Sequence, residues 1–270
     1  SPSRGLGDVY KRQLDKDAPN YYINMGEAMG KYAIETSMVK VFGSDCSHWV
    51  IDQGLQIFGG YGFLEEYPLA PAYRDDRINQ IWEGTNEINR QIITGFIMKK
   101  ALTEELPYRE AIREIDSFLS QKVDQDDNLL AKECDTVETA KKIGLYLFNE
   151  ALSEFAQDLK NEHQIVEMLS DVFTDIYTAE STIIRVKKIM DSDKPIASTV
   201  DIAKTFTSEM VDRILANTHS ILHAIYQGPA PTDVNKKIKQ FEERMRLANN
   251  VVQSKRNIAE YVFDQKKYPY

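Results

Sequence analysis

The sequence predicts an all-α protein, and three observations support that fold class. Apolar residues recur at helical spacing along most of the chain, Pro- and Gly-containing stretches separate these segments, and no segment alternates like a convincing strand. The 270 residues are 42% hydrophobic and 28% charged, which suits a sizeable core in one large or two modest domains. We therefore predict a helical bundle followed by a second helical-bundle region.

The first helical pattern runs from about Tyr21 to Phe58. The glycines and prolines of "FGGYGFLEEYPLAP" then predict an ordered loop, and a short helix follows at about 72–81. The first pattern carries a stripe that is apolar except at one aspartate: Ile34, Met38, Val41, Phe42, Asp45 and Trp49.

The next helix is expected to start near Asn86. Thr85 or Asn86 would cap it, and Glu87 in the first turn would favour the positive end of the helix dipole. Its apolar side chains recur along the segment leading to "MKKAL": Ile88, Ile92, Phe96 and Met98.

Composition shifts around Pro107, so we place a domain boundary near residue 105, between domains at 14–104 and 105–270. Beyond it lie further helical patterns, interrupted by "DSDKP" and "QGPAPTD". These patterns cover about 133–160, 162–190, 196–227 and 232–263. The first of them has a regular apolar face: Leu145, Phe148, Leu152, Phe155 and Leu159.

Residues 1–13, "SPSRGLGDVYKRQ", lack an initiator Met and an amphipathic period. They resemble translated sequencing adapter, and a flexible tail is the alternative. We exclude them from the fold and expect the authentic sequence to start near Leu14, with the gene cut at its 5′ side.

Charge and cysteine usage restrict the function. The net charge is -9, and phosphate-backbone binding is therefore not expected as the main role. Cys46 and Cys134 have no CxxC spacing, so we expect a reducing compartment and no metal site. His219 and His223, four residues apart on a helical pattern, could form a two-ligand metal face, but we favour a surface or core-edge pair. No apolar run approaches a membrane span, and any membrane contact would be peripheral.

The stretch "IWEGTNEI" places Glu83 between Trp82 and Gly84. A carboxylate beside an indole is poorly hydrated, and glycine allows close approach of another group, so the stretch suits a base held against a ligand. Taken alone, the same residues also suit an ordinary helix start with an acidic residue near the dipole.

Three stretches in order, "LQIFGGYGF", "RDDRI" and "IWEGTNEI", resemble the C-terminal domain of the acyl-CoA dehydrogenase family. The resemblance covers about residues 30–100. Residues from about 105 onward resemble, in overall pattern, the extra helical region of the very-long-chain branch and its bacterial relatives.

The resemblance implies an FAD-dependent oxidoreductase that converts a (long-chain) acyl-CoA to the trans-2-enoyl-CoA in fatty acid β-oxidation. Glu83 falls on the catalytic base that removes the α-proton. Trp82 would keep water from Glu83, and Gly84 would let the substrate approach. By the same resemblance, the positions expected to contact the protein's own FAD are Thr85, Asn86 and Glu87. Those expected to contact the FAD of a neighbouring subunit are Gln56, Ile57, Phe58, Gly59 and Gly60.

The shared flavin site implies a homodimer or a dimer of dimers, and electron-transfer flavoprotein is the expected electron acceptor. The family's N-terminal helical and β-rich flavin domains have no counterpart here, so we expect the chain alone to be inactive and to bind FAD weakly. Two alternatives stay open, a non-catalytic helical protein for binding or assembly and an acyl-CoA oxidase. We expect the bacterial cytoplasm, with the mitochondrial matrix as the other option.

Overall fold

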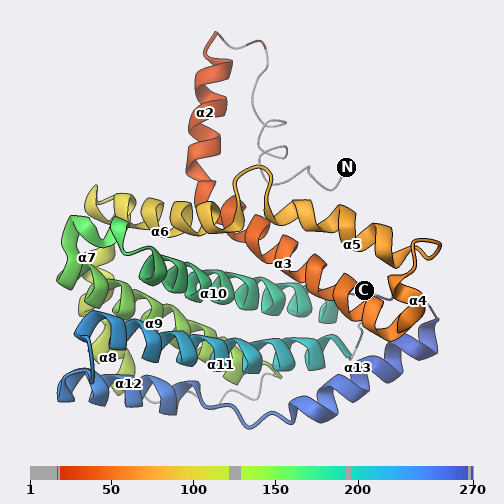
Figure 1. The fold of residues 1–270 in the computed structure, drawn as a ribbon. Helices are drawn as coiled ribbons and strands as arrows, with labels where there is room; N and C mark the ends of the chain where they lie inside the picture. Colours follow the sequence, from red (N-terminus) through yellow and green to blue (C-terminus); the bar gives the residue numbers. More distant parts are fainter. Residues whose placement is uncertain are drawn as a thin grey trace. The chain divides into compact units, whose positions relative to one another are not determined.

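The computed structural model describes residues 17, 19–121, 129–192, 196, 198–266 and 269 (Figure 1). Those residues form helices, turns and loops without a strand, which confirms the predicted all-α class. The chain separates into two compact units, Ser1–Leu106 and Pro107–Tyr270. The predicted artefact tail, residues 1–13, lies outside the described residues.

The first unit is built around one long helix. Its elements are α2 (Tyr21–Lys31), α3 (Ala33–Phe58), α4 (Gly60–Phe63), α5 (Leu69–Arg77), the 3₁₀ turn η1 (Ile78–Gln80) and α6 (Asn86–Leu102). Helix α3 packs mainly against α6 and α5 (Figure 1). Met38 and Val41 of α3 and Ile93 of α6 are buried in this unit.

The structure corrects three expectations in the first unit. The helix predicted from Tyr21 to Phe58 is broken at Tyr32, two residues after Gly30, and glycine disfavours a continuous helix at such an interior position. The predicted loop after α3 contains α4, and α5 begins at Leu69 rather than near residue 72. The predicted apolar face of α3 is confirmed at Met38 and Val41 but not at Trp49, and in α6 Ile88 is exposed while Ile93 is buried.

Helix α4 lies so close to α3 that Gly62 has no space for a side chain. A Cβ atom there would lie 2.5 Å from the Leu55 carbonyl oxygen and 3.1 Å from the Phe58 Cβ atom. We therefore expect Gly62→Ala to lower the free energy of unfolding by about 1–3 kcal/mol, because the backbone must shift. Gly95→Ala, in α6, is the matched control, since nothing lies within 4 Å of a Cβ atom placed on Gly95. Gly95→Ala should leave the protein's stability unchanged or raise it by about 0.5–1 kcal/mol, as measured by urea unfolding. Equal effects of Gly62→Ala and Gly95→Ala would contradict the packing argument.

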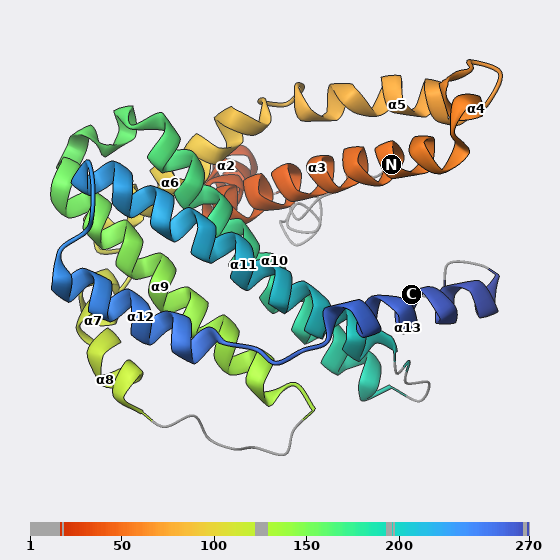
Figure 2. The ribbon, with the colours of Figure 1, turned by 60° about the horizontal axis from the view of Figure 1, so that its bottom comes forward.

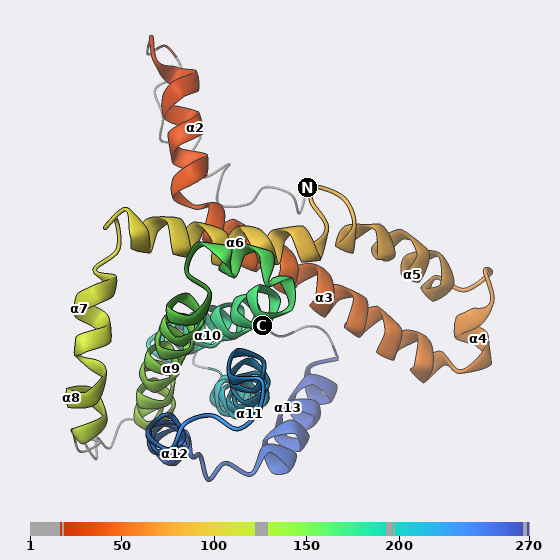
Figure 3. The same ribbon diagram turned by 60° about the vertical axis from the view of Figure 1, so that its left-hand side comes forward.

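The second unit is a larger bundle, in which α9, α10 and α11 lie side by side with α12 on α9 and α13 on α11 (Figures 2 and 3). Its elements are α7 (Tyr108–Arg113), α8 (Ile115–Ser120), α9 (Ala131–Phe155), the 3₁₀ helix η2 (Ala156–Asn161), α10 (His163–Met190), α11 (Ser198–Tyr226), α12 (Thr232–Met245) and α13 (Val251–Gln265). Ile143, Leu147 and Leu169 are among its fully buried side chains.

The helix predicted at 232–263 is two helices, α12 and α13, with an extended connection at 246–250. Tertiary bonds explain the break: Asn249 donates to a Glu133 carboxylate oxygen at 3.0 Å and to Ser208 Oγ at 3.2 Å. Asn250 then caps α13 by accepting from the Gln253 N–H. No described helix is long and apolar enough to cross a membrane.

Three tyrosines surround Glu150 in the second unit. Burial, and then the charge of Glu150, raises the pKa of Tyr108 to about 12. Burial also raises the pKa of Tyr146 and that of Tyr226, whose hydroxyl donates to Glu150 Oε2 at 2.5 Å.

Alkaline pH should therefore destabilise the second unit. A phenol whose folded pKa lies above its unfolded value, about 10, contributes stability in full below that value, and the contribution is lost as pH rises toward 12. The measurement is the unfolding free energy as a function of alkaline pH. Tyr108→Phe should reduce the slope, whereas Tyr61→Phe, on an exposed side chain of the first unit, should leave it unchanged. A slope insensitive to Tyr108 would contradict this assignment.

Candidate functional site

The turn between η1 and α6 has an unusual backbone at Glu83. Glu83 and Gly84 both lie in the left-handed region, with φ values of 53° and 82°. For a residue with a side chain this conformation costs roughly 1–2 kcal/mol, and it persists where the surroundings fix it. Thr85 then begins α6 as its N-cap, because its hydroxyl accepts from the Ile88 N–H at 3.3 Å. This confirms the capping predicted from the sequence.

Three polar residues of α3, which we call the α3 anchor, hold this turn: Lys40, Ser44 and Asp45. The Lys40 ammonium donates to the Gly84 carbonyl oxygen at 2.9 Å and to Asn86 Oδ1 at 2.6 Å. The Asn86 amide donates in turn to Ser44 Oγ at 2.9 Å and to Asp45 Oδ1 at 2.7 Å. The side chain of Asn86 is thus fully occupied in fixing the start of α6 to α3.

Asp45 ties both flanks of the turn to the same helix. Its Oδ1 atom accepts from Gln80 Nε2 at 2.9 Å on the preceding side, and its Oδ2 atom accepts from the Arg90 guanidinium at 3.1 Å on the following side. Within α6, Asn89 also donates to the Gly84 carbonyl at 2.8 Å. Hydrogen bonds from residues before the turn, from residues after it and from α3 therefore hold the turn in place.

Electrostatics at the turn follow from these contacts. Burial lowers the pKa of Lys40, against the opposing charges of Asp45 and Glu87. The pKa of Glu87 is lowered by hydrogen bonds from its own backbone N–H and from Thr85. The site therefore combines one partly desolvated cation with a carboxylate stabilised at the start of α6.

Helix α5, which leads into the turn, is fixed by the buried carboxylate of Asp76. Ser47 Oγ donates to Asp76 Oδ1 at 2.5 Å, and His48 Nδ1 lies 3.3 Å from Asp76 Oδ2. A buried carboxylate that lost these partners would be costly, so the contacts define how α5 lies on α3. His48, to which the sequence assigned no role, thus has a structural one.

Trp82 and Glu83 are both exposed, Trp82 by 57%. The expectation that Trp82 shields Glu83 from water is therefore not met by the residues that the structure describes. The indole cannot desolvate a neighbouring carboxylate while it is itself largely in solvent. Exclusion of water at Glu83 has to come from a bound molecule or from another part of the protein.

The predicted FAD residues fall into two groups. Thr85, Asn86 and Glu87 lie at the start of α6, where first-turn N–H groups and the helix dipole suit an anionic group. Asn86 is 4% exposed and its amide is engaged with the α3 anchor, so a contact from this residue would come from its backbone. Part of this helix end is already engaged, since the Glu87 carboxylate accepts from its own backbone N–H and the Thr85 hydroxyl accepts from the Ile88 N–H. The remaining first-turn N–H groups are what this end could offer an anionic cofactor.

The second group, residues 56–60, is exposed at the far end of α3, where Gly59 ends the helix with a φ of 58°. Gln56 lies 16 positions after Lys40 on that helix, a distance of about 24 Å at 1.5 Å per residue. The structure therefore brings Trp82–Glu87 together and holds residues 56–60 well away from them.

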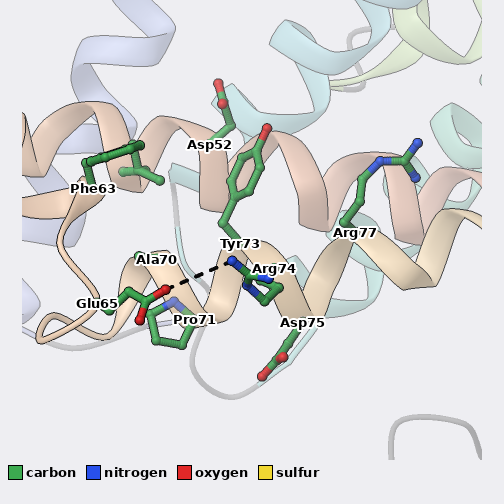
Figure 4. A pocket seen from close by; sticks show the side chains of 10 residues that line it. Asp52, Phe63, Glu65, Ala70, Pro71, Tyr73, Arg74, Asp75 and Arg77 are labelled. Atoms are coloured by element: carbon green, nitrogen blue, oxygen red, sulfur yellow. Dashed lines mark ion pairs between the residues drawn. The ribbon is translucent and has the colours of Figure 1, made fainter.

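An open pocket of about 980 Å³ lies between α3, α4 and α5 (Figure 4). Arg74 lies 4.0 Å from Glu65 across it, and both side chains are highly exposed. None of Trp82–Glu87 lines this pocket, so it is separate from the turn. Its lining residues are Asp52, Leu55, Phe63, Glu65, Ala70, Pro71, Tyr73, Arg74, Asp75 and Arg77.

His219 and His223 do not form part of a metal site in the described structure. His219 Nε2 lies 3.3 Å from a Glu242 carboxylate oxygen. Within the described ranges no group of three or more His, Cys, Asp or Glu side chains is placed to hold a metal ion.

Sequence reasoning missed the α3 anchor. The available signal was Asp45, the one charged residue in an otherwise apolar stripe. Such a position predicts a buried or half-buried polar contact. What the sequence could not supply was the partner, since Asp45 and Asn86 are 41 residues apart.

The fold and the anchored turn at Glu83 and Gly84 describe an all-α helical domain, and comparison with known proteins assigns its family. Models described as acyl-CoA dehydrogenase, C-terminal domain, match residues 20–98 and 139–236. The chain is 33% identical, over 90% of its length, to a probable acyl-CoA dehydrogenase of Bacillus subtilis. The chain belongs to the acyl-CoA dehydrogenase family and corresponds to the C-terminal part of the proteins in that family.

Other comparisons agree with this assignment. A crystal structure of an acyl-CoA dehydrogenase complexed with FAD from Bacillus anthracis superposes with a TM-score of 0.88 at 30% identity, over 98% of this chain and 45% of that one. A caffeyl-CoA reductase–Etf complex subunit of Acetobacterium woodii is 38% identical over 24% of this chain and 17% of its own length. The chain spans 41% of the length of the Bacillus subtilis relative.

Proposed function

We propose that this chain is the C-terminal part of an FAD-dependent acyl-CoA dehydrogenase acting in fatty acid β-oxidation. The observation that carries the proposal is Glu83, a carboxylate held on a strained and strongly anchored turn at the start of α6. Strained backbone that the surroundings over-determine is a feature of functional sites. The FAD complex of the Bacillus anthracis protein supports the choice of cofactor.

Glu83 is the proposed base. Its carboxylate takes the α-proton of the acyl thioester, the electron pair of the broken Cα–H bond forms the new Cα=Cβ double bond, and the β-hydrogen leaves with the electron pair of its own bond as hydride. FAD supplies the acceptor for that hydride. The product is the trans-2-enoyl-CoA. An α-proton beside a thioester is a weak acid, so a fixed base and exclusion of water are both needed.

Gly84 and Trp82 are the proposed substrate contacts. Gly84 is in the left-handed region, and a Cβ there would lie 3.1 Å from the Asn89 side-chain nitrogen. A glycine therefore keeps the turn tight and leaves its outer side open to a ligand. The exposed Trp82 would be covered, and Glu83 desolvated, when substrate or another part of the protein lies against them.

We further propose that the flavin site is completed between subunits in a homodimer or a dimer of dimers. Two observations support this. Residues 56–60 lie too far along α3 to serve the same end of one flavin as Thr85–Glu87. The first unit also exposes large apolar side chains that a monomer of this chain would leave in water, among them Trp49, Ile57 and Phe63.

Long-chain acyl-CoA is the proposed substrate, electron-transfer flavoprotein the acceptor and the bacterial cytoplasm the location. The first choice follows from the resemblance of the second unit to the very-long-chain branch, and a butyryl-CoA dehydrogenase of Syntrophomonas wolfei matches only 38% of the chain. The Etf complex of the Acetobacterium woodii relative supports the second. The relatives named here come from bacteria, and the cytoplasmic location stays a prediction from the sequence.

The test is anaerobic titration of the intact protein with acyl-CoA of different lengths. We expect a yellow protein whose flavin absorbance is bleached by long-chain acyl-CoA and recovers with electron-transfer flavoprotein. The 270-residue chain alone should bind FAD weakly and show no turnover. An intact protein that binds no FAD, or is not bleached by any acyl-CoA, would favour the non-catalytic alternative. Rapid recovery with oxygen would indicate an oxidase.

A further inference from the structure

We propose that Lys40 is a positioning residue for Glu83. Its ammonium group holds the Gly84 carbonyl and the Asn86 side chain together, and so keeps Glu83 in the conformation from which its carboxylate can reach the substrate. The inference rests on the proposed function of Glu83 as the base. It assigns a role to a residue that touches neither the reacting atoms nor the cofactor.

The turn itself is poorly determined by its own residues. Gly84 can adopt many backbone conformations at little cost, and Glu83 disfavours the left-handed one that it adopts. Only bonds from outside the turn can select this geometry. Hydrogen bonds to the Gly84 carbonyl oxygen do so by fixing the peptide that follows the glycine.

Two groups donate to the Gly84 carbonyl, and they act differently. Asn89 belongs to α6 and moves with the helix that begins at the turn, so its 2.8 Å bond fixes local geometry. Lys40 belongs to α3 and reaches the same oxygen at 2.9 Å across 44 positions of sequence. Lys40 therefore fixes the turn relative to the long helix of the first unit.

The surroundings of Lys40 suit this role. Ser44 lies one helical turn further along α3, and Asp45 lies beside it. Both accept from the Asn86 amide, so Lys40 and its neighbours hold Asn86 from two directions. Burial lowers the pKa of Lys40, while the nearby charges of Asp45 and Glu87 act in the opposite direction. A half-buried ammonium with two acceptors at hydrogen-bond distance has little freedom to move.

The test is Lys40→Met in the intact holoprotein. Methionine keeps the length and the apolar stem but removes all donors. We expect the rate of flavin reduction at saturating acyl-CoA to fall about 10- to 100-fold, because small displacements of a catalytic group are costly. The dissociation constant for acyl-CoA, the FAD content and the melting temperature should change little. Hydrogen exchange of the segment 81–90 should become faster.

Two variants serve as rescue and control. Lys40→Arg retains donors that can reach two acceptors and should recover part of the rate. Lys99→Met removes an exposed lysine of α6 that does not belong to the α3 anchor, and should leave the rate and the exchange of 81–90 unchanged. Equal effects of Lys40→Met and Lys99→Met would overturn the inference.

The outcome is separable from that of the proposed function. If Glu83→Gln abolishes bleaching while Lys40→Met reduces flavin at the wild-type rate, the base stands and the role of Lys40 is overturned. If Glu83→Gln is bleached normally, the proposed function fails first. If Lys40→Met loses its fold or its FAD, Lys40→Gln decides, because its polar side chain suits the half-buried position but is shorter and uncharged and cannot hold the Gly84 carbonyl and Asn86 together. Slow reduction with faster exchange of 81–90 then supports the inference, and a wild-type rate overturns it.

Discussion

Glu83→Gln is expected to slow flavin reduction by acyl-CoA about 10²- to 10⁴-fold while the FAD stays bound. A glutamine side chain has nearly the same shape but cannot accept the α-proton, and general bases contribute rate factors of this size. The turn should keep its geometry, because the Gly84 carbonyl and the Asn86 side chain carry its anchoring bonds. The measurement is stopped-flow absorbance of the flavin after mixing with acyl-CoA without oxygen.

Glu66→Gln is the matched control, since this exposed carboxylate lies between α4 and α5 and belongs to neither proposed contact group. Its bleaching rate should equal that of the unchanged protein. Loss of FAD from the Glu83 variant would instead make Glu83 a cofactor contact. Bleaching at an unchanged rate would remove it from the chemistry, and another carboxylate would then have to be the base.

The helices of this protein were predictable wherever apolar spacing is regular. The start of α6 was also predictable, from residue type rather than spacing, because Thr85 accepts from the Ile88 N–H as an N-cap threonine does. The break at 246–250 is the opposite case. Its sequence, "RLANN", contains no proline or glycine, and the helix ends there because Asn249 is held by residues of α9 and α11. Only the tertiary structure contains that information.

The candidate site, too, was predictable from the sequence only in part. Glu83 was singled out because a carboxylate between an indole and a glycine is unusual and because of the order of the neighbouring motifs, and its role as the base stays a prediction. Its left-handed backbone was not predictable, since few residues other than glycine adopt it. Lys40 was missed for another reason: a lysine on a helix is ordinarily a solvated residue. Its role becomes visible when α3 lies against the start of α6.

Arg244→Met is expected to lower the free energy of unfolding of the second unit by about 3–5 kcal/mol, the cost typical of breaking a buried ion pair from one side. Arg244 of α12 is 10% exposed and donates to an Asp135 carboxylate oxygen at 2.7 Å. It also donates to the carbonyl oxygens of Phe118 at 2.9 Å and Gln121 at 2.8 Å, and its guanidinium lies 4.1 Å from the Phe118 ring centre.

Methionine would fill much of the same space but leave the Asp135 carboxylate and two carbonyl groups without this donor. Lysine should recover part of the loss, because its ammonium can pair with Asp135 but cannot reach all three acceptors in the planar arrangement of a guanidinium. Arg246→Met is the control on an exposed arginine two residues later, expected within about 0.5 kcal/mol of the unchanged protein. Urea unfolding followed by circular dichroism measures all three.

The double variant Arg244→Met with Asp135→Leu distinguishes the ion pair from simple packing. If the single change is costly because it leaves a buried carboxylate unpaired, removing that carboxylate should restore part of the stability. Additive losses in the double variant would show that Arg244 acts mainly through Phe118 and the two carbonyl groups.

Comparison with Gly62→Ala then assigns the unfolding transitions. If the two compact units unfold separately, Arg244→Met moves one transition and Gly62→Ala the other, and a single shared shift would show that they unfold together.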